Sequence, residues 1–178
     1  MRDITGIILH CTATHADWRN TSPTADKVAE VKRWHLARGW SDIGYHFLID
    51  RDGTVAKGRP ITRDGAHVAG HNAGTIGVSL FGGHGSSETD QFADNFTPAQ
   101  DAALRALLAD LRLTYGAVPV TGHNEYAAKA CPGFRVKDWL AQAPEPPAQA
   151  EVAKTWVNPA VTTLDKIRAI LADHDANV

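Results

Sequence analysis

Cysteine is scarce in this chain, with only two among 178 residues. Small secreted domains held together by disulfides need several cysteine pairs, so that class of protein is excluded. A single bridge between Cys11 and Cys131 is possible, but nothing in the sequence indicates an oxidising compartment. A metal-binding or catalytic role for at least one of the two thiols fits the sequence better.

An excess of one charge and long apolar runs are also lacking. The formal net charge is −2, so no basic field favours nucleic acid or an anionic membrane as a partner. No uninterrupted apolar stretch is long enough for a transmembrane helix. The first residues lead almost directly into a strand-like run, which leaves no room for a signal peptide. We therefore expect synthesis in the cytoplasm, wherever the protein acts later.

What the sequence does contain is an alternation of strand-like and helix-like segments. β-branched or alternating apolar runs predict strands, and apolar residues at helical spacing behind capping residues predict helices. The expected strands are residues 4–12, 45–50, 54–56, 76–81 and 118–120, and the expected helices are 22–39, 97–116 and a short one around 139–140. This order predicts an α/β fold with a central mixed sheet covered by helices on both faces.

Composition divides the chain into three parts. Residues 1–142 are expected to form the folded domain, and residues 143–157 form a linker rich in proline and alanine. Residues 158–178 are expected to form an amphipathic helix whose apolar side needs a partner. Three partners are open for it: the parent domain, a second chain or a membrane surface. The nearly balanced charge of the segment disfavours the membrane.

Nine histidines are many for a chain of this size, and three residues suggest chemistry. His10, His123 and Cys131 supply two imidazoles and one thiolate, a set that binds zinc and leaves a fourth position for water. The alternative stays open on these residues alone, because a strand-end histidine is often a hydrogen-bonded core residue and a buried cysteine a small hydrophobe. Cys11 is expected to pack on the opposite face of its strand from His10.

Five ordered blocks carry a resemblance to a known family. The chain resembles the type 2 N-acetylmuramoyl-L-alanine amidases, which include T7-like phage lysozymes and the peptidoglycan recognition proteins, from about Ile4 to Leu140. The blocks are His10-Cys11-Thr12, residues 44–53 (Gly-Tyr-His-Phe-Leu-Ile-Asp-Arg-Asp-Gly), 65–72 (Gly-Ala-His-Val-Ala-Gly-His-Asn), 76–80 (Ile-Gly-Val-Ser-Leu) and 122–133, from Gly-His to Pro-Gly.

The resemblance implies the amidase fold and hydrolysis of the amide bond between N-acetylmuramic acid and L-alanine in peptidoglycan. It implies one Zn²⁺ per chain, with Tyr45 and Lys129 as catalytic residues. A cationic Lys129 can stabilise the oxyanion that forms at the carbonyl, and Tyr45 can hold or deprotonate the attacking water. The resemblance also places His67 and Asn72 beside the substrate groove. The implied zinc ligands are His10, His123 and Cys131.

Other functions compete with the amidase. A non-catalytic module that only binds peptidoglycan is one, but a complete ligand set together with Tyr45 and Lys129 favours catalysis. An interaction protein that acts through its tail helix is another, and the tail can have that role in addition to hydrolysis. The missing signal peptide favours a phage endolysin, which reaches the wall after the membrane is breached. A bacterial enzyme acting on cytoplasmic muropeptides stays open.

Overall fold

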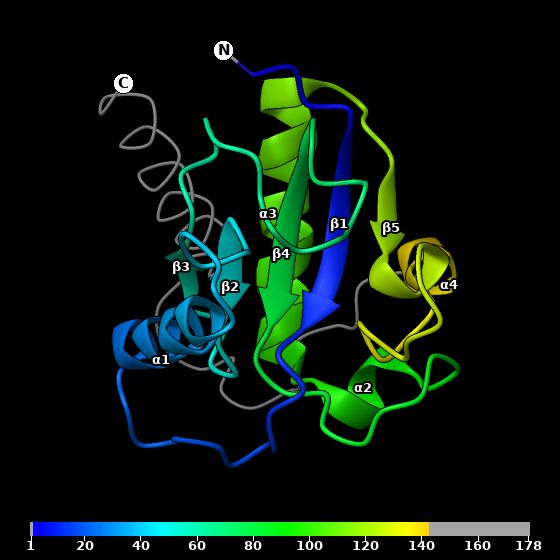
Figure 1. The fold of residues 1–178 in the computed structure, drawn as a ribbon. Coiled ribbons are helices and arrows are strands. Elements are labelled where there is room, and N and C mark those ends of the chain that lie inside the picture. Colours follow the sequence, from blue (N-terminus) through cyan, green and yellow to red (C-terminus); the bar gives the residue numbers. More distant parts are fainter. Residues whose placement is uncertain (1, 143–178) are drawn as a thin grey trace, which may run out of the picture.

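A mixed sheet forms the centre of the protein, whose computed structural model describes residues 2–142 (Figure 1). Its five strands run in the order β3-β2-β4-β1-β5. β1 is parallel to β4 and β5, β2 is parallel to β4, and β3 is antiparallel to β2. The predicted mixed α/β architecture is confirmed. The strands are β1 Gly6–Cys11, β2 Phe47–Ile49, β3 Val55–Lys57, β4 Thr75–Leu80 and β5 Val120–Gly122.

The helices follow their capping signals where these are strong. The Thr97 hydroxyl accepts the Gln100 N–H, Pro98 stands in the first turn, and Gly116 ends the longest helix. Two short elements, α2 and η1, were not predicted, because three or four residues are too few to show a helical period. The helices are α1 Thr24–Ala37, α2 Phe92–Asn95, α3 Pro98–Tyr115, α4 Val136–Ala141 and the 3₁₀ helix η1 His123–Glu125.

The two faces of the sheet are covered differently. α3 lies behind the sheet in Figure 1, where its leucines join the main core with the apolar residues of β1 and β4. On the other face, Val31 of α1 packs with Leu48 of β2 in a second, smaller cluster. In front of β4 and β1 the segment 65–74 crosses instead of a helix. The prediction of helices on both faces therefore holds for α3 and α1, while a loop covers the middle strands.

The segments predicted after residue 142, a linker at 143–157 and a helix at 158–178, lie outside the described residues. Their boundaries therefore stay predictions.

A buried ion pair joins α1 to the end of β2. The Lys27 Nζ atom lies 2.8 Å from both carboxylate oxygens of Asp50, and Thr24 donates its hydroxyl proton to the same carboxylate at 2.7 Å. Both charged side chains are at most 6% exposed. Burial raises the pKa of Asp50, but the hydrogen bonds from Lys27, Thr24 and the Arg51 backbone outweigh it and hold that pKa below its ordinary value. The pair therefore stabilises the fold above the ordinary aspartate pKa, and this stabilisation is lost as the pH falls through the folded-state pKa.

Replacing one partner of this ion pair is expected to destabilise the fold much more than replacing both partners. Lys27→Met should lower the free energy of unfolding by about 3–5 kcal/mol, because it leaves the Asp50 carboxylate buried without a counter-charge. The double variant Lys27→Met/Asp50→Leu should recover most of that loss. Urea denaturation of both variants at neutral pH measures the difference, and equal losses would contradict the ion-pair account.

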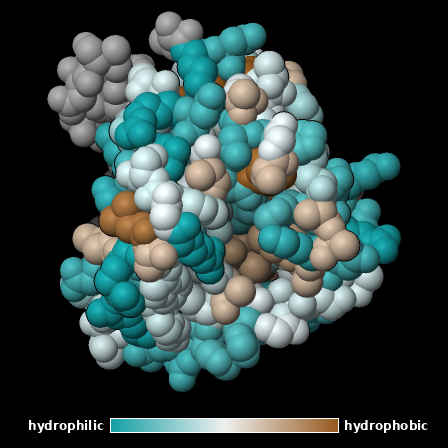
Figure 2. Space-filling model, viewed as in Figure 1, coloured by the Kyte–Doolittle hydropathy of each residue, from teal (hydrophilic) through white to brown (hydrophobic). Residues whose placement is uncertain are grey.

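The described surface has few large apolar features. Only Leu36, Leu113 and Tyr126 are exposed large hydrophobic side chains within residues 2–142. On the face drawn in Figure 2, hydrophobic residues are scattered among hydrophilic ones. No helix in the described part of the chain is long and apolar enough to cross a membrane.

Candidate metal centre and active site

The pairing of parallel strands brings His10 and His123 to one edge of the sheet. His10 is the penultimate residue of β1 and is almost completely buried. His123 follows β5 directly, and Gly122 of β5 is in register with Leu9 of β1. The two imidazole centroids are 4.8 Å apart. The structure thus brings two of the three predicted ligands together from positions that are distant in the sequence.

The loop after η1 folds back and delivers Cys131 to the same edge. The Asn124 N–H donates to the Cys131 carbonyl at 2.7 Å, and the Cys11 N–H donates to the Cys131 Sγ atom at 3.3 Å. This turn needs a glycine at position 122, since a Cβ there would lie 2.3 Å from the Asn124 Oδ1 atom. The motif that begins at Gly122 therefore packs closely around the glycine and holds a histidine and a cysteine near each other.

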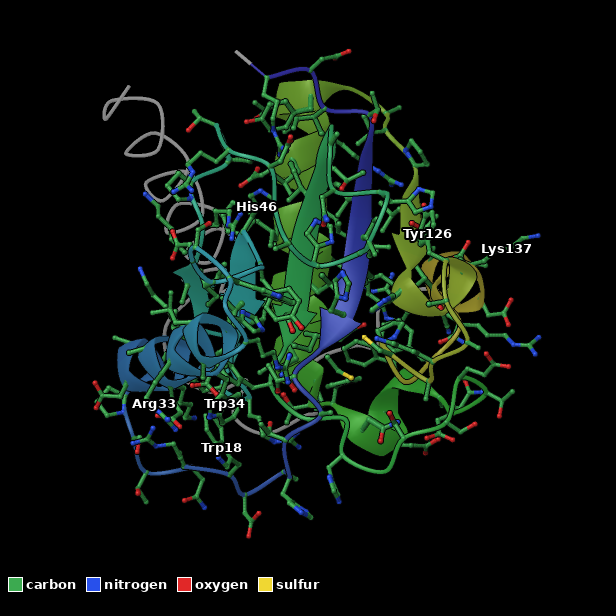
Figure 3. The ribbon with its side chains drawn as sticks, in the orientation of Figure 1. Trp18, Arg33, Trp34, His46, Tyr126 and Lys137 are labelled. Carbon is green, nitrogen blue, oxygen red and sulfur yellow. The ribbon has the colours of Figure 1, made fainter. Side chains whose placement is uncertain are left out.

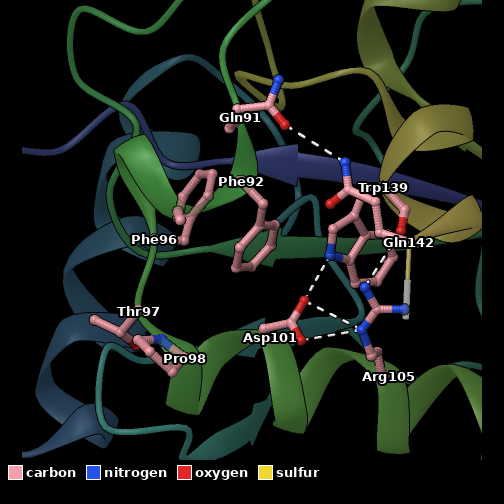
Figure 4. A pocket seen from close by; sticks show the side chains of 10 residues that line it. Gln91, Phe92, Phe96, Thr97, Pro98, Asp101, Arg105, Trp139 and Gln142 are labelled. Carbon is pink, nitrogen blue, oxygen red and sulfur yellow. Dashed lines mark hydrogen bonds and ion pairs between the residues drawn. The ribbon is translucent and has the colours of Figure 1, made fainter. Parts of the chain in front are cut away.

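α4, which follows this loop in the chain, packs against α3. The Trp139 indole N–H donates to Asp101, which also accepts from Arg105, and the Arg105 guanidinium lies 4.3 Å from the centre of the Trp139 ring. These residues border a cavity of about 240 Å³ between α2, α3 and α4 (Figure 4). None of the predicted site residues lines this cavity.

The three donor atoms have the spacing of metal ligands. One donor atom each from His10, His123 and Cys131 lies within 4.8 Å of the others, and this is the one such group found among the described residues. The Cys131 Sγ atom is 3.7 Å from the His10 Nδ1 atom. Nitrogen and sulfur ligands on a tetrahedral zinc ion stand about 3.5 Å apart, given the usual bond lengths. The group is thus close to a zinc geometry without rearrangement.

The protonation of the histidines also suits a metal. Burial lowers the pKa of His10 well below its ordinary value, and the charges of His67, His123 and Lys129 lower it further. Burial and then the Lys129 charge lower the pKa of His123 in the same direction. Both imidazoles are therefore neutral near pH 7, which is the form that binds a metal ion.

The two cysteines lie together, and neither forms a disulfide. Cys11 is buried in the main core, as predicted, but it also contacts Cys131 through its backbone and side chain. The hydrogen bond with Cys11 and burial raise the pKa of the Cys131 thiol. A coordinated divalent cation supplies the positive charge that removes such a proton. Two neutral imidazoles and this thiol thus form a donor set that fits zinc.

Tyr45 lies against the ligand group. Its half-buried ring has its centroid 5.2 Å from that of His10 and 5.3 Å from that of His35. Burial, and then the nearby cysteines, raise the pKa of Tyr45 above its ordinary value. The hydroxyl therefore keeps its proton at neutral pH and can donate a hydrogen bond beside the metal ligands.

Lys129 is an exposed residue in the loop that carries Cys131. Its backbone N–H donates to the Ala127 carbonyl at 2.8 Å, which forms a tight turn just before the cysteine. The positive charge of Lys129 lowers the pKa of both His10 and His123, so the ammonium group acts on the ligand cluster. A positive charge here can stabilise negative charge that develops on a bound carbonyl oxygen.

His67 and Asn72 occupy the segment that crosses in front of β4 and β1. The Asn72 Oδ1 atom accepts the backbone N–H groups of His67 and Val68 at 2.8 and 2.9 Å. The His67 ring is 7% exposed, and its Nδ1 atom lies 3.1 Å from the His10 Nε2 atom. Their predicted contact with substrate stays a prediction. The contact between His67 and His10 was not predicted from the sequence. The glycines at positions 65 and 77 leave room for the His67 ring.

Two further residues with aromatic rings lie to either side of the central strands. In Figure 3 the labelled side chains of His46 and Tyr126 lie on either side of β4 and β1, to the left and to the right. His46 is buried, and its Nδ1 atom accepts the Gly77 N–H at 2.9 Å, so its role is structural. Tyr126 is partly exposed, and its ring contacts that of His71 with centroids 4.6 Å apart.

Comparison with known families decides the identity of the chain. The family described as N-acetylmuramoyl-L-alanine amidase matches residues 1–134, which include every predicted site residue. The chain belongs to this amidase family. It is accordingly an N-acetylmuramoyl-L-alanine amidase by family, and the resemblance read from the five sequence blocks is confirmed.

Two relatives and one solved structure illustrate the similarity of this amidase. The endolysin of Klebsiella phage KP32 is 44% identical over 134 residues, which cover 75% of this chain and 83% of the relative. The endolysin of Escherichia phage T7 is 44% identical over 133 residues, with the same coverage. The amidase LysC from Clostridium intestinale URNW is 29% identical with a TM-score of 0.63, covering 79% of this chain and 85% of that one. The fold therefore agrees with the sequence-based family.

Proposed function

We propose that this amidase uses zinc held by His10, His123 and Cys131 to hydrolyse the bond between N-acetylmuramic acid and L-alanine in peptidoglycan. The convergence of three donor atoms within 4.8 Å at one edge of the sheet carries the proposal. One ion per chain fits a set of three protein ligands with an open position. A bound zinc ion would lower the pKa of a water molecule toward neutrality and polarise the substrate carbonyl.

Two further residues act on the reacting groups. Lys129 places its positive charge near the carbonyl oxygen as negative charge accumulates on it, which stabilises the transition state more than the ground state. The Tyr45 hydroxyl, still protonated at neutral pH, orients the attacking water by a hydrogen bond or passes its proton on. Asn72 is proposed to border the groove that takes the sugar and stem peptide.

We propose that the enzyme acts as an endolysin on the intact wall. Support comes from the two phage relatives that carry that name at 44% identity over three quarters of the chain. The alternative substrate is a free muropeptide of the kind a bacterial recycling enzyme takes. The pure enzyme should be incubated with intact sacculi and, separately, with free muropeptides, and the products analysed by mass spectrometry. Release of stem peptides that begin with L-alanine from sacculi is expected, whereas cleavage of muropeptides alone would contradict the endolysin role.

A truncation tests the proposed division of the chain. Removal of residues 143–178 should leave one zinc per chain and hydrolysis of purified peptidoglycan largely intact, because every proposed site residue precedes Gln142. Turnover should be measured at a temperature where circular dichroism shows the truncated protein folded. A hundredfold loss under those conditions would mean that the tail contributes to the active site. Lysis of whole cells by both proteins would then report any separate role of the tail.

A further inference from the structure

We propose that His67 is a positioning residue, which accepts a hydrogen bond from the His10 Nε2 atom and so directs the His10 Nδ1 atom toward the metal. The inference rests on the proposed zinc site. In this proposal His67 orients the zinc ligand His10, and this role replaces the substrate contact that the sequence predicted.

The two nitrogen atoms of His10 have different surroundings. The Nδ1 atom lies 3.7 Å from the Cys131 Sγ atom, on the side where the three donor atoms converge. The Nε2 atom points the other way, 3.1 Å from the His67 Nδ1 atom, in a buried contact. Only Nδ1 is therefore free to join the ligand group in this arrangement.

The hydrogen-bond network assigns the protons. A neutral imidazole that offers the lone pair of Nδ1 to a metal carries its proton on Nε2. That N–H is buried and needs an acceptor, which His67 provides when its own Nδ1 atom is unprotonated. The proton of His67 then lies on its Nε2 atom, 3.5 Å from the Thr75 hydroxyl oxygen. A ligand histidine usually donates to a carboxylate or a carbonyl, and here a second imidazole takes that place.

The scaffold holds His67 in this orientation. A Cβ atom at Gly77 of β4 would lie 2.5 Å from the His67 ring, so the ring occupies space that only a glycine leaves open. Asn72 fixes the backbone at His67 through its amide oxygen. The ring is 7% exposed, which leaves little of it for a substrate to touch. The contact with His10 is therefore the main polar contact available to the ring, because the ring is buried, fits the space beside Gly77 and is held by Asn72 through the backbone.

Zinc affinity tests the proposal independently of turnover. Competition with a chromogenic chelator should show that His67→Phe, which keeps a ring but removes the acceptor, binds zinc about 10–100-fold more weakly than the wild type. His67→Asn should recover much of the affinity, since its amide oxygen can take the place of Nδ1. His71→Phe is the matched control in the same loop, and its zinc affinity should be unchanged because His71 is exposed and does not contact His10.

The outcomes separate this inference from the proposed function. If the wild type binds no zinc, the proposed zinc site is wrong and the inference falls with it. If the wild type binds one zinc and His67→Phe binds it equally tightly, only the inference is overturned. A raised KM of His67→Phe for peptidoglycan would then support the substrate contact that the sequence predicted. Should His67→Phe fail to fold, ¹⁵N NMR of the zinc-loaded wild type decides the matter. Coordination of His10 through Nδ1 is expected, and coordination through Nε2 would overturn the proposal.

Discussion

Cys131→Ala is expected to lose both bound zinc and turnover on peptidoglycan. The thiolate is one of only three protein ligands, and two imidazoles alone hold zinc weakly. The loss of zinc affinity should exceed the roughly 10–100-fold that follows removal of an outer hydrogen-bond partner. His10→Ala and His123→Ala should behave alike, because each removes one donor from the same group. Elemental analysis of the purified proteins and turnover assays measure the two effects.

Cys11→Ala provides a matched control for the thiol. Cys11 touches Cys131 but packs in the main core and belongs to no donor group, so this variant should retain one zinc per chain. Purified wild type that contains almost no zinc, and that keeps its turnover in a strong chelator, would refute the proposed mechanism. Loss of zinc from Cys11→Ala and Cys131→Ala alike would instead indicate a general disturbance of the loop.

Lys129→Ala and Tyr45→Phe are expected to keep the fold and the zinc while losing turnover. Removal of one group that stabilises the transition state typically lowers kcat by about 10²–10³-fold. For Lys129 the lost interaction is a positive charge close to the ligand histidines. For Tyr45 it is one hydroxyl, and the ring that packs against His10 is preserved. Circular dichroism, zinc content and kcat on purified peptidoglycan separate the three properties.

Lys137→Ala is the control for the lysine variant. Lys137 is an exposed residue of α4, and its side chain points away from the strands in Figure 3. Its turnover should match that of the wild type. If Lys129→Ala has normal zinc content and wild-type turnover as well, Lys129 is only a solvated charge in the loop. The same result for Tyr45→Phe would mean that the Tyr45 hydroxyl has no catalytic role and that its ring only packs against its neighbours.

Local patterns in the sequence determined most of the secondary structure. The apolar run that contains His10 predicts β1, and the signal from Thr97 to Gln100 predicts the start of α3, because strands and capped helices depend on neighbouring residues. The boundaries of β2 were less accurate. It spans Phe47–Ile49 rather than 45–50, since pairing with β3 and β4 decides where a strand ends.

The sequence by itself also determined the ligand candidates and the family, because the five motifs can be recognised in order along the chain. Only the tertiary structure decided that His10 and Cys131, 121 positions apart, bring Nδ1 and Sγ to within 3.7 Å. It likewise decided that His67 turns toward His10 rather than toward solvent. The physical reason is that these contacts depend on the register of β1 with β4 and β5 and on space left by Gly77, which are properties of packing between distant segments and leave no periodic trace in the sequence.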